Sequence, residues 1–111
     1  SKTSSTSALM SVIKPQIVCV CCCAGSPEYT STDANQFPTQ QFIDRVAPYT
    51  PEIYVTTLCV DYANDEYTSM NGNIIVASVN GVVTVSCSAS DTPLKDTEWF
   101  KANRVMPDAW K

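Results

Sequence analysis

The sequence predicts an all-β fold: an antiparallel β-sandwich or barrel-like domain with at most two short helices. Four apolar runs rich in β-branched residues have the length of strands, and they lie at 16–24, 52–62, 73–79 and 82–89. Two Asn-Gly pairs, at 71–72 and 80–81, each separate two such apolar segments. An Asn-Gly pair between apolar runs is typical of a tight β-hairpin turn.

Length and composition limit the classes of protein to consider. With 111 residues the chain is one domain, and we expect a flexible Ser/Thr-rich linker over 1–10 and a single β-rich domain over 11–111. Lys and Arg number 7 against 11 Asp and Glu, without a basic cluster, so we expect no nucleic-acid binding by this domain. The longest apolar run, 17–24, is too short for a membrane span, so we expect no membrane insertion.

The first strand, in the run QIVCVCCCAG (residues 16–25), carries the strongest chemical signal because it holds four cysteines. Alternate side chains of a strand share a face. One face would carry Ile17, Cys19, Cys21 and Cys23, and the other Val18, Val20 and Cys22. Both sets are apolar, which predicts a strand that is covered on both sides.

Geometry disfavours disulfide or zinc chemistry within this cluster. Next-but-one residues of a strand are roughly 6.5–7 Å apart, at the long limit for a disulfide. Only Cys59 and Cys87 remain as distant partners, and whether those two pair with each other stays open. Zinc needs four converging ligands, the chain has no histidine, and the Cys19–Cys22 pair lies inside a strand. We expect reduced, buried, metal-free thiols and no cofactor; the residues concerned are Cys19, Cys21, Cys22 and Cys23.

Two later segments are ambiguous between helix and strand. In 39–47, Thr39 would cap a short helix, and two prolines then interrupt the chain before the strand at 52–62. In 96–104, Asp96 would cap a second short helix.

The two Asn-Gly pairs together predict a three-stranded meander, with strands near 66–70, 73–79 and 82–89. Pairing Val79 with Val82 defines its two faces. The expected core face carries Ile74, Val76, Val83, Val85 and Cys87. The other face is more mixed and carries Ile75, Ala77, Thr84 and Ser86.

No residue pattern predicts catalysis. Without histidine, a Ser or Cys nucleophile lacks its usual base, so we expect no enzyme and name no catalytic residue. Asp61, Asp65 and Glu66 are candidate calcium ligands, because hard cations bind several oxygens. Their spacing departs from that of the EF-hand loop, and a solvated turn is the other interpretation of this segment.

The strand at 52–62 predicts a partner, because it is apolar on both faces. A two-layered domain covers one face of each sheet, so the second face needs a helix, a loop or another copy. We therefore predict a homodimer. Its interface candidates are Tyr54, Leu58 and Val60. The competing hypothesis is a monomer in which the long segment 25–51 covers that face.

A Ser/Thr tether followed by a β-rich domain with unpaired cysteines resembles the protruding domain of small non-enveloped RNA-virus capsid proteins, such as those of shrimp nodaviruses. The resemblance implies a non-enzymatic domain on the virion surface that forms dimeric spikes, contacts other capsid subunits and meets a host surface receptor.

Two other classes remain open. One is a secreted extracellular β-sandwich binding module, because VTVSCSASDTPLKDTEWFK (83–101) resembles part of an immunoglobulin domain, with Cys87 and Trp99 as its hallmark pair. The other is a small metal-binding or redox protein that uses the cysteine cluster.

Overall fold

The computed structural model describes residues 4–111, and their fold is rich in β structure, as predicted. The strands are β1 (Val18–Ala24), β2 (Ile53–Asp61), β3 (Glu66–Ser69), β4 (Ile74–Val79) and β5 (Val82–Cys87). The α-helices are α1 (Ser7–Ile13), α2 (Gln40–Val46) and α3 (Glu98–Asn103). Short 3-10 helices span Asp33–Asn35, Leu94–Asp96 and Asp108–Trp110. The sheets do not close into a barrel, and the three α-helices among the described residues exceed the predicted maximum of two.

The strands form a three-stranded sheet in the order β1-β2-β3 and a separate β4–β5 hairpin. β2 pairs antiparallel with β3, as expected for a mostly antiparallel fold, but parallel with β1, which the prediction did not include. The reason is the segment between β1 and β2, which contains α2. A helical crossover of this length returns the chain in the same direction, as in other parallel strand pairs.

The two ambiguous segments are both helical. The N–H of Phe42 donates to Oγ1 of Thr39 at 3.2 Å, so Thr39 caps α2 as predicted. α3 begins one residue later than predicted, because Oγ1 of Thr97, not Asp96, accepts from the N–H of Phe100 at 3.2 Å.

The segment predicted as a linker, residues 1–10, overlaps helix α1. Residues 1–3 lie outside the described part of the chain. Thr6 caps α1, which begins at Ser7, and Met10 is buried. Because Met10 of α1 packs in the core, the ordered domain starts before residue 11.

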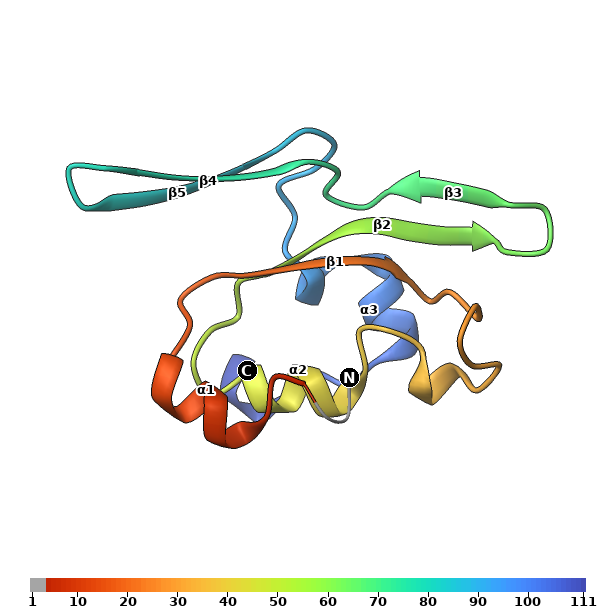
Figure 1. Ribbon diagram of the computed structural model, residues 1–111, viewed down its shortest axis with the longest axis horizontal. Helices are drawn as coiled ribbons and strands as arrows, with labels where there is room; N and C mark the ends of the chain where they lie inside the picture. The colour runs from red at the N-terminus through yellow and green to blue at the C-terminus, as the bar shows by residue number, and fades with distance from the viewer. Residues whose placement is uncertain (1–3) are drawn as a thin grey trace.

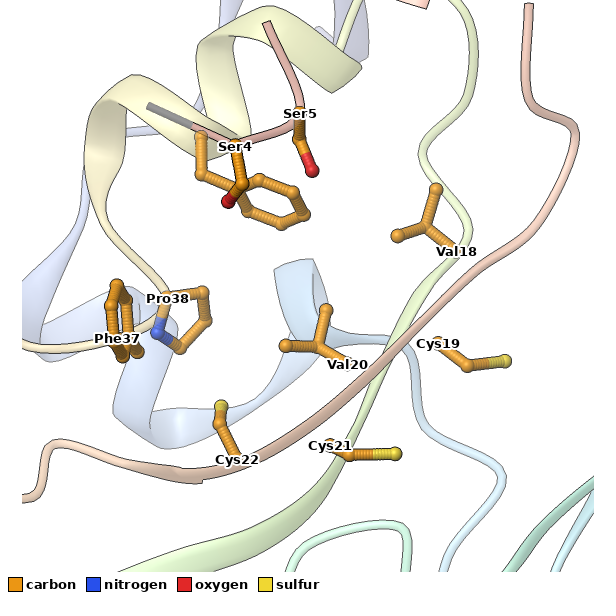
Figure 2. A pocket seen from close by; sticks show the side chains of 10 residues that line it. Ser4, Ser5, Val18, Cys19, Val20, Cys21, Cys22, Phe37 and Pro38 are labelled. Atoms are coloured by element: carbon orange, nitrogen blue, oxygen red, sulfur yellow. The ribbon is translucent and has the colours of Figure 1, made fainter. Parts of the chain in front are cut away.

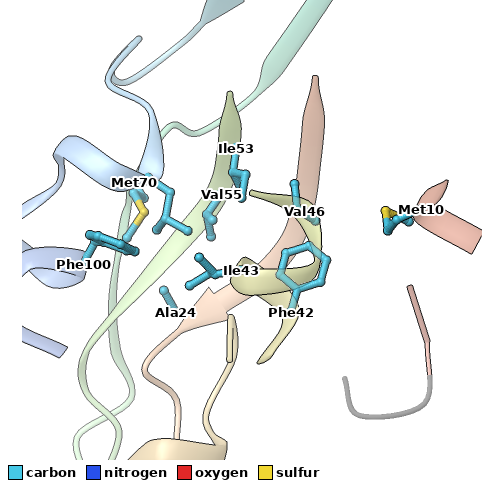
Figure 3. Close-up of a cluster of buried hydrophobic side chains, with 10 residues drawn as sticks. Met10, Ala24, Phe42, Ile43, Val46, Ile53, Val55, Met70 and Phe100 are labelled. Carbon is cyan, nitrogen blue, oxygen red and sulfur yellow. The ribbon is translucent and has the colours of Figure 1, made fainter. Parts of the chain in front are cut away.

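All three α-helices lie on one side of the β1–β2–β3 sheet (Figure 1). The main cluster of buried side chains fills the space between these two layers (Figure 3). It consists of Met10, Ala24, Phe42, Ile43, Val46, Ile53, Val55, Met70, Leu94 and Phe100. This side of the sheet we call the inner face, and the side away from the helices the outer face.

Asn71 joins the sheet to the hairpin, and its Asn-Gly pair does not form the predicted turn. Its side chain is fully buried. Its Oδ1 accepts from the N–H of Val55 at 2.7 Å, and its Nδ2 donates to the carbonyls of Ser90 and Thr92, both at 2.8 Å. β3 therefore pairs with β2 and not with β4, so the predicted three-stranded meander is wrong.

The second Asn-Gly pair does form the predicted turn. Asn80 and Gly81 both have positive φ, 51° and 79°, as a type I′ turn requires. Val79 lies opposite Val82, which is the predicted register.

Arg104 fastens the loop before α2 to the helix α3. Its guanidinium donates to the carbonyls of Pro38 at 2.9 Å, Gln36 at 2.8 Å and Asp33 at 3.3 Å. It also lies 4.8 Å from the centre of a ring of Trp99, in cation–π contact. Partial burial lowers the pKa of this guanidinium, which stays charged.

We predict that Asn71→Ala lowers the free energy of unfolding by about 2–4 kcal/mol, because it leaves a buried N–H and two carbonyls without partners. Chemical denaturation with fluorescence detection measures the change. Asn73→Ala is the matched control: Asn73 is exposed, and such surface changes stay within about 0.5 kcal/mol. Equal stability of the two variants would contradict the role given to Asn71.

Candidate functional site

The β4–β5 hairpin, residues 74–87, is the most unusual surface of this chain. None of its strand residues is buried. Ile75, Val79 and Val82 share one face, where they are 62%, 65% and 63% exposed. Val76 and Val83 lie on the opposite face and are also exposed. The predicted core face of the meander is therefore wrong, and both faces of the hairpin offer apolar side chains.

The hairpin projects past the end of the β1–β2 pair, on the outer side of the sheet (Figure 1). Its strands contain no charged residue and no proline, the features that usually protect free strand edges from pairing with other chains. The total accessible surface is 6601 Å². A folded monomer of this mass is expected to expose about 6,000 Å². The surplus fits a chain with one arm in which no strand residue is buried.

The three predicted interface residues differ in how much of their surface is exposed to solvent. Tyr54 is only 6% exposed, so within one copy it is an interior residue. Leu58 is half-buried and packs against the core. Val60 is 59% exposed and remains available to a partner. Cys87 at the hairpin base and Asp91 lie close to the hydroxyl of Tyr54.

Sequence reasoning missed the hairpin as a contact surface, although the signal was present. The more mixed face of the predicted meander, with Ile75, Ala77, Thr84 and Ser86, continues in the predicted register to the pair Val79 and Val82, which the prediction did not assign to it. A hairpin that is apolar on both faces cannot be satisfied by a single core. The missing step was to ask what would cover the second face.

The cysteine cluster lies on β1, and its side chains alternate between the two faces as predicted. Only one of the two faces is covered, whereas the prediction had both covered. Val18, Val20 and Cys22 pack towards the core on the inner face. Cys19 and Cys21 are exposed, so the prediction that all four cluster cysteines are buried is wrong for these two. Helices cover one face of this sheet only, and a strand of such a sheet is half-exposed.

All six cysteines are free thiols, so Cys59 and Cys87 do not pair. Burial raises the pKa of Cys22 to about 11, with a smaller contribution from the neighbouring thiols. Burial also raises the pKa of Cys23 to about 11, helped by the thiol of Cys59, with which it shares a hydrogen bond. A raised pKa keeps a thiol protonated and unreactive at neutral pH. These two groups are therefore poor nucleophiles and poor metal ligands.

The candidate calcium ligands occupy an exposed turn between β2 and β3. The carboxylate of Asp61 accepts from Nδ2 of Asn64 at 2.8 Å and from its N–H at 3.3 Å, and these bonds lower the pKa of Asp61. Oδ1 of Asp65 accepts from the hydroxyl of Tyr67 at 3.2 Å. Over residues 4–111, no three acidic or thiol side chains, Glu66 included, converge as a metal site would require.

No helix within residues 4–111 has both the length and the apolar character needed to cross a membrane. No protein-family model, curated protein or solved structure matches this chain. The functional argument therefore rests on the surfaces described above.

We predict that at pH 8 the native protein is alkylated at Cys22 and Cys23 on the order of 100-fold more slowly than an unstructured cysteine peptide, because their thiolate fractions are smaller. The rate should rise about tenfold per pH unit until the pH approaches 11. Iodoacetamide labelling read by peptide mass spectrometry measures both rates. In guanidinium chloride all six cysteines should react alike. Fast native labelling of Cys22 at pH 8 would contradict the raised pKa.

Proposed function

We propose that this chain is a non-enzymatic association domain that works as a homodimer, and that the dimer forms through the β4–β5 hairpin. The observation that carries the proposal is the exposure of apolar side chains on both faces of that hairpin. A two-stranded hairpin is marginally stable alone in water. Packing against another surface would stabilise it.

The energetic scale supports association. Ile75, Val76, Val79, Val82 and Val83 are each between 45% and 65% exposed. At roughly 100 Å² for each Val or Ile side chain, this is on the order of 300 Å² of apolar surface per copy, or about 7 kcal/mol on burial. Two copies gain about twice that, which matches or exceeds the cost of association, about 4–15 kcal/mol.

Charge indicates where two copies would meet. Each copy carries a formal net charge of −4, so like copies repel each other over most of their surface. The hairpin strands carry no charge at all. Contact through them brings two acidic domains together without burying a charged group.

Within this class, we propose that the chain is the protruding domain of a non-enveloped RNA-virus capsid, where such dimers would form spikes that meet a host surface. The β-rich domain, its unpaired cysteines and its apolar arm support this setting. The β-sandwich predicted for it also stays a proposal, with its second layer supplied between copies.

The immunoglobulin-like alternative has less support. An immunoglobulin domain pairs its strands antiparallel and places its hallmark tryptophan on a strand. Here β1 and β2 are parallel, and Trp99 lies on α3.

We predict that the protein sediments at about twice its 12.1 kDa mass at micromolar concentration. The double substitution Val79→Thr, Val82→Thr should weaken the dimer by about 100-fold or more, because it buries four hydroxyls per dimer without partners. Analytical ultracentrifugation measures both. The matched control is Val12→Thr, Val105→Thr, at positions 81% and 71% exposed outside the hairpin. The control should leave the dimer unchanged; a wild type that stays monomeric at 100 µM would overturn the proposal.

The capsid setting has a separate test, which is the coding sequence upstream of Ser1. We predict that it encodes jelly-roll strands preceded by a Lys/Arg-rich arm. Sequencing of the complete reading frame decides the matter. A secretory signal directly ahead of this domain would contradict the capsid setting and favour an extracellular module.

A further inference from the structure

β1 has a free edge, which is regular from Val18 to Val20 and shifts register between Val20 and Cys23. It is the outermost strand of its sheet, and its main chain pairs with β2 on one side only. The N–H of Val18 donates to the carbonyl of Glu52 at 2.9 Å, on the β2 side. Because these groups alternate along a strand, the N–H of Cys19 points to the free edge. β1 contains no charge and no proline.

A groove of about 430 Å³ follows this edge (Figure 2). One wall is β1 itself, from Val18 to Cys22. The opposite wall is formed by Phe37, Pro38 and Phe42, with Ser4 and Ser5 beside them. The groove therefore lies between the edge of the sheet and the helical layer, and aromatic and proline side chains line it. A strand added to β1 would have every second side chain over this wall.

We propose that the β4–β5 hairpin of a second copy pairs with the free edge of β1 and places its apolar side chains in this groove, so that two copies exchange hairpins reciprocally. This inference rests on the proposed function and names the surface that receives the hairpin. Adding a strand to an exposed sheet edge is a recurring mode of protein recognition.

The dimensions and composition of the two surfaces agree. β4 and β5 are six residues long and β1 is seven, so the strands match in length, and the regular part of β1 before its register shift, Val18 to Val20, offers the edge for pairing. Neither surface brings a charged residue into the contact. A reciprocal exchange buries two such contacts per dimer, which moves the buried area towards the ~1,200–2,000 Å² of stable interfaces.

The hairpin of the same copy does not reach this groove. Its base is tied to the sheet by hydrogen bonds from the N–H groups of Ser88 and Ala89 to the carbonyls of Asn73 and Asn71, at 2.9 and 3.0 Å. From there it runs along the outer side of the sheet (Figure 1). The groove is lined by Phe42 of α2 and therefore reaches the helical layer.

β1 of a second copy is the competing occupant, and packing disfavours it. Its inward side chains, Val18, Val20 and Cys22, already pack against the helical layer of their own copy. A β1–β1 pair would leave both grooves empty. The hairpin has unused apolar side chains on both faces, so whichever face turns inward fills the groove.

The first test blocks the edge. Cys19→Pro removes the N–H that points away from β2, a position where an edge strand tolerates proline. We expect the variant to keep its circular dichroism spectrum and thermal unfolding, and its dimer to dissociate about 100-fold more readily, since proline blocks strand pairing. Cys19→Ala is the matched control and should dimerise normally. A Cys19→Pro variant that folds and dimerises like the wild type would overturn the inference while leaving the proposed hairpin dimer intact.

The second test identifies the occupant by cross-linking. Ser78→Cys and Thr84→Cys place a thiol on opposite faces of the hairpin, each combined with Cys87→Ser to remove its native thiol. A 1:1 mixture of ¹⁵N-labelled and unlabelled protein is treated with a short bismaleimide at pH 8, and linked peptides are read by mass spectrometry. We expect mixed-isotope links from a hairpin cysteine to Cys19 or Cys21 in at least one variant.

The other outcomes each overturn the inference. Mixed-isotope links between the β1 cysteines of two copies would assign the edge to a β1–β1 pair. Links between two hairpin cysteines would mean that the hairpins pack on each other. A dimer without any link to Cys19 or Cys21 would place the hairpin elsewhere. A protein that sediments as a monomer would overturn the proposed homodimer as well. Sedimentation therefore distinguishes failure of the hairpin–β1 pairing from failure of the proposed function.

Discussion

The hydrogen bonds of one buried side chain, Asn71, determine how the two sheets of this domain are joined. Its oxygen takes the place of a main-chain partner for Val55 in β2. Its nitrogen holds the carbonyls of Ser90 and Thr92, where the chain returns from the hairpin. Both ends of the hairpin are thereby tied to the middle strand of the sheet. The direction of the hairpin, and with it the exposure of its apolar faces, depends on this amide.

The same residue marks the limit of prediction from sequence. The two Asn-Gly pairs are identical as dipeptides. Local chemistry described the turn at Asn80 correctly, and the space around Gly81 in that turn is open. At Asn71 the interior offered a strand N–H and two carbonyls, and a buried amide satisfies such groups better than a turn does. Nothing in the local sequence reveals partners that lie 16 to 21 residues away.

In the strands and helix caps too, some features follow from the local sequence and others only from the whole fold. Alternation along β1 assigned Val20 and Cys21 to opposite faces correctly, and Thr39 caps its helix as the pattern predicted. Periodicity gives the two faces of a strand, but what covers each face is a property of the whole fold. The parallel pairing of β1 with β2 follows from the helical crossover between them, and the interior position of Tyr54 follows from residues near the hairpin base on the other face.

The contacts of Arg104 have a consequence for how this domain can diverge. The guanidinium holds the segment before α2 entirely through main-chain carbonyls, at Asp33, Gln36 and Pro38. These three bonds do not depend on which side chains the bonded residues carry, although the side chains of Gln36, Pro38 and Thr39 are buried. Exposed positions such as Ala34 and Asn35 can change identity while the backbone keeps its course. The exposed positions of this loop can therefore change the chemistry that they present to solvent, while its buried side chains keep the backbone in place.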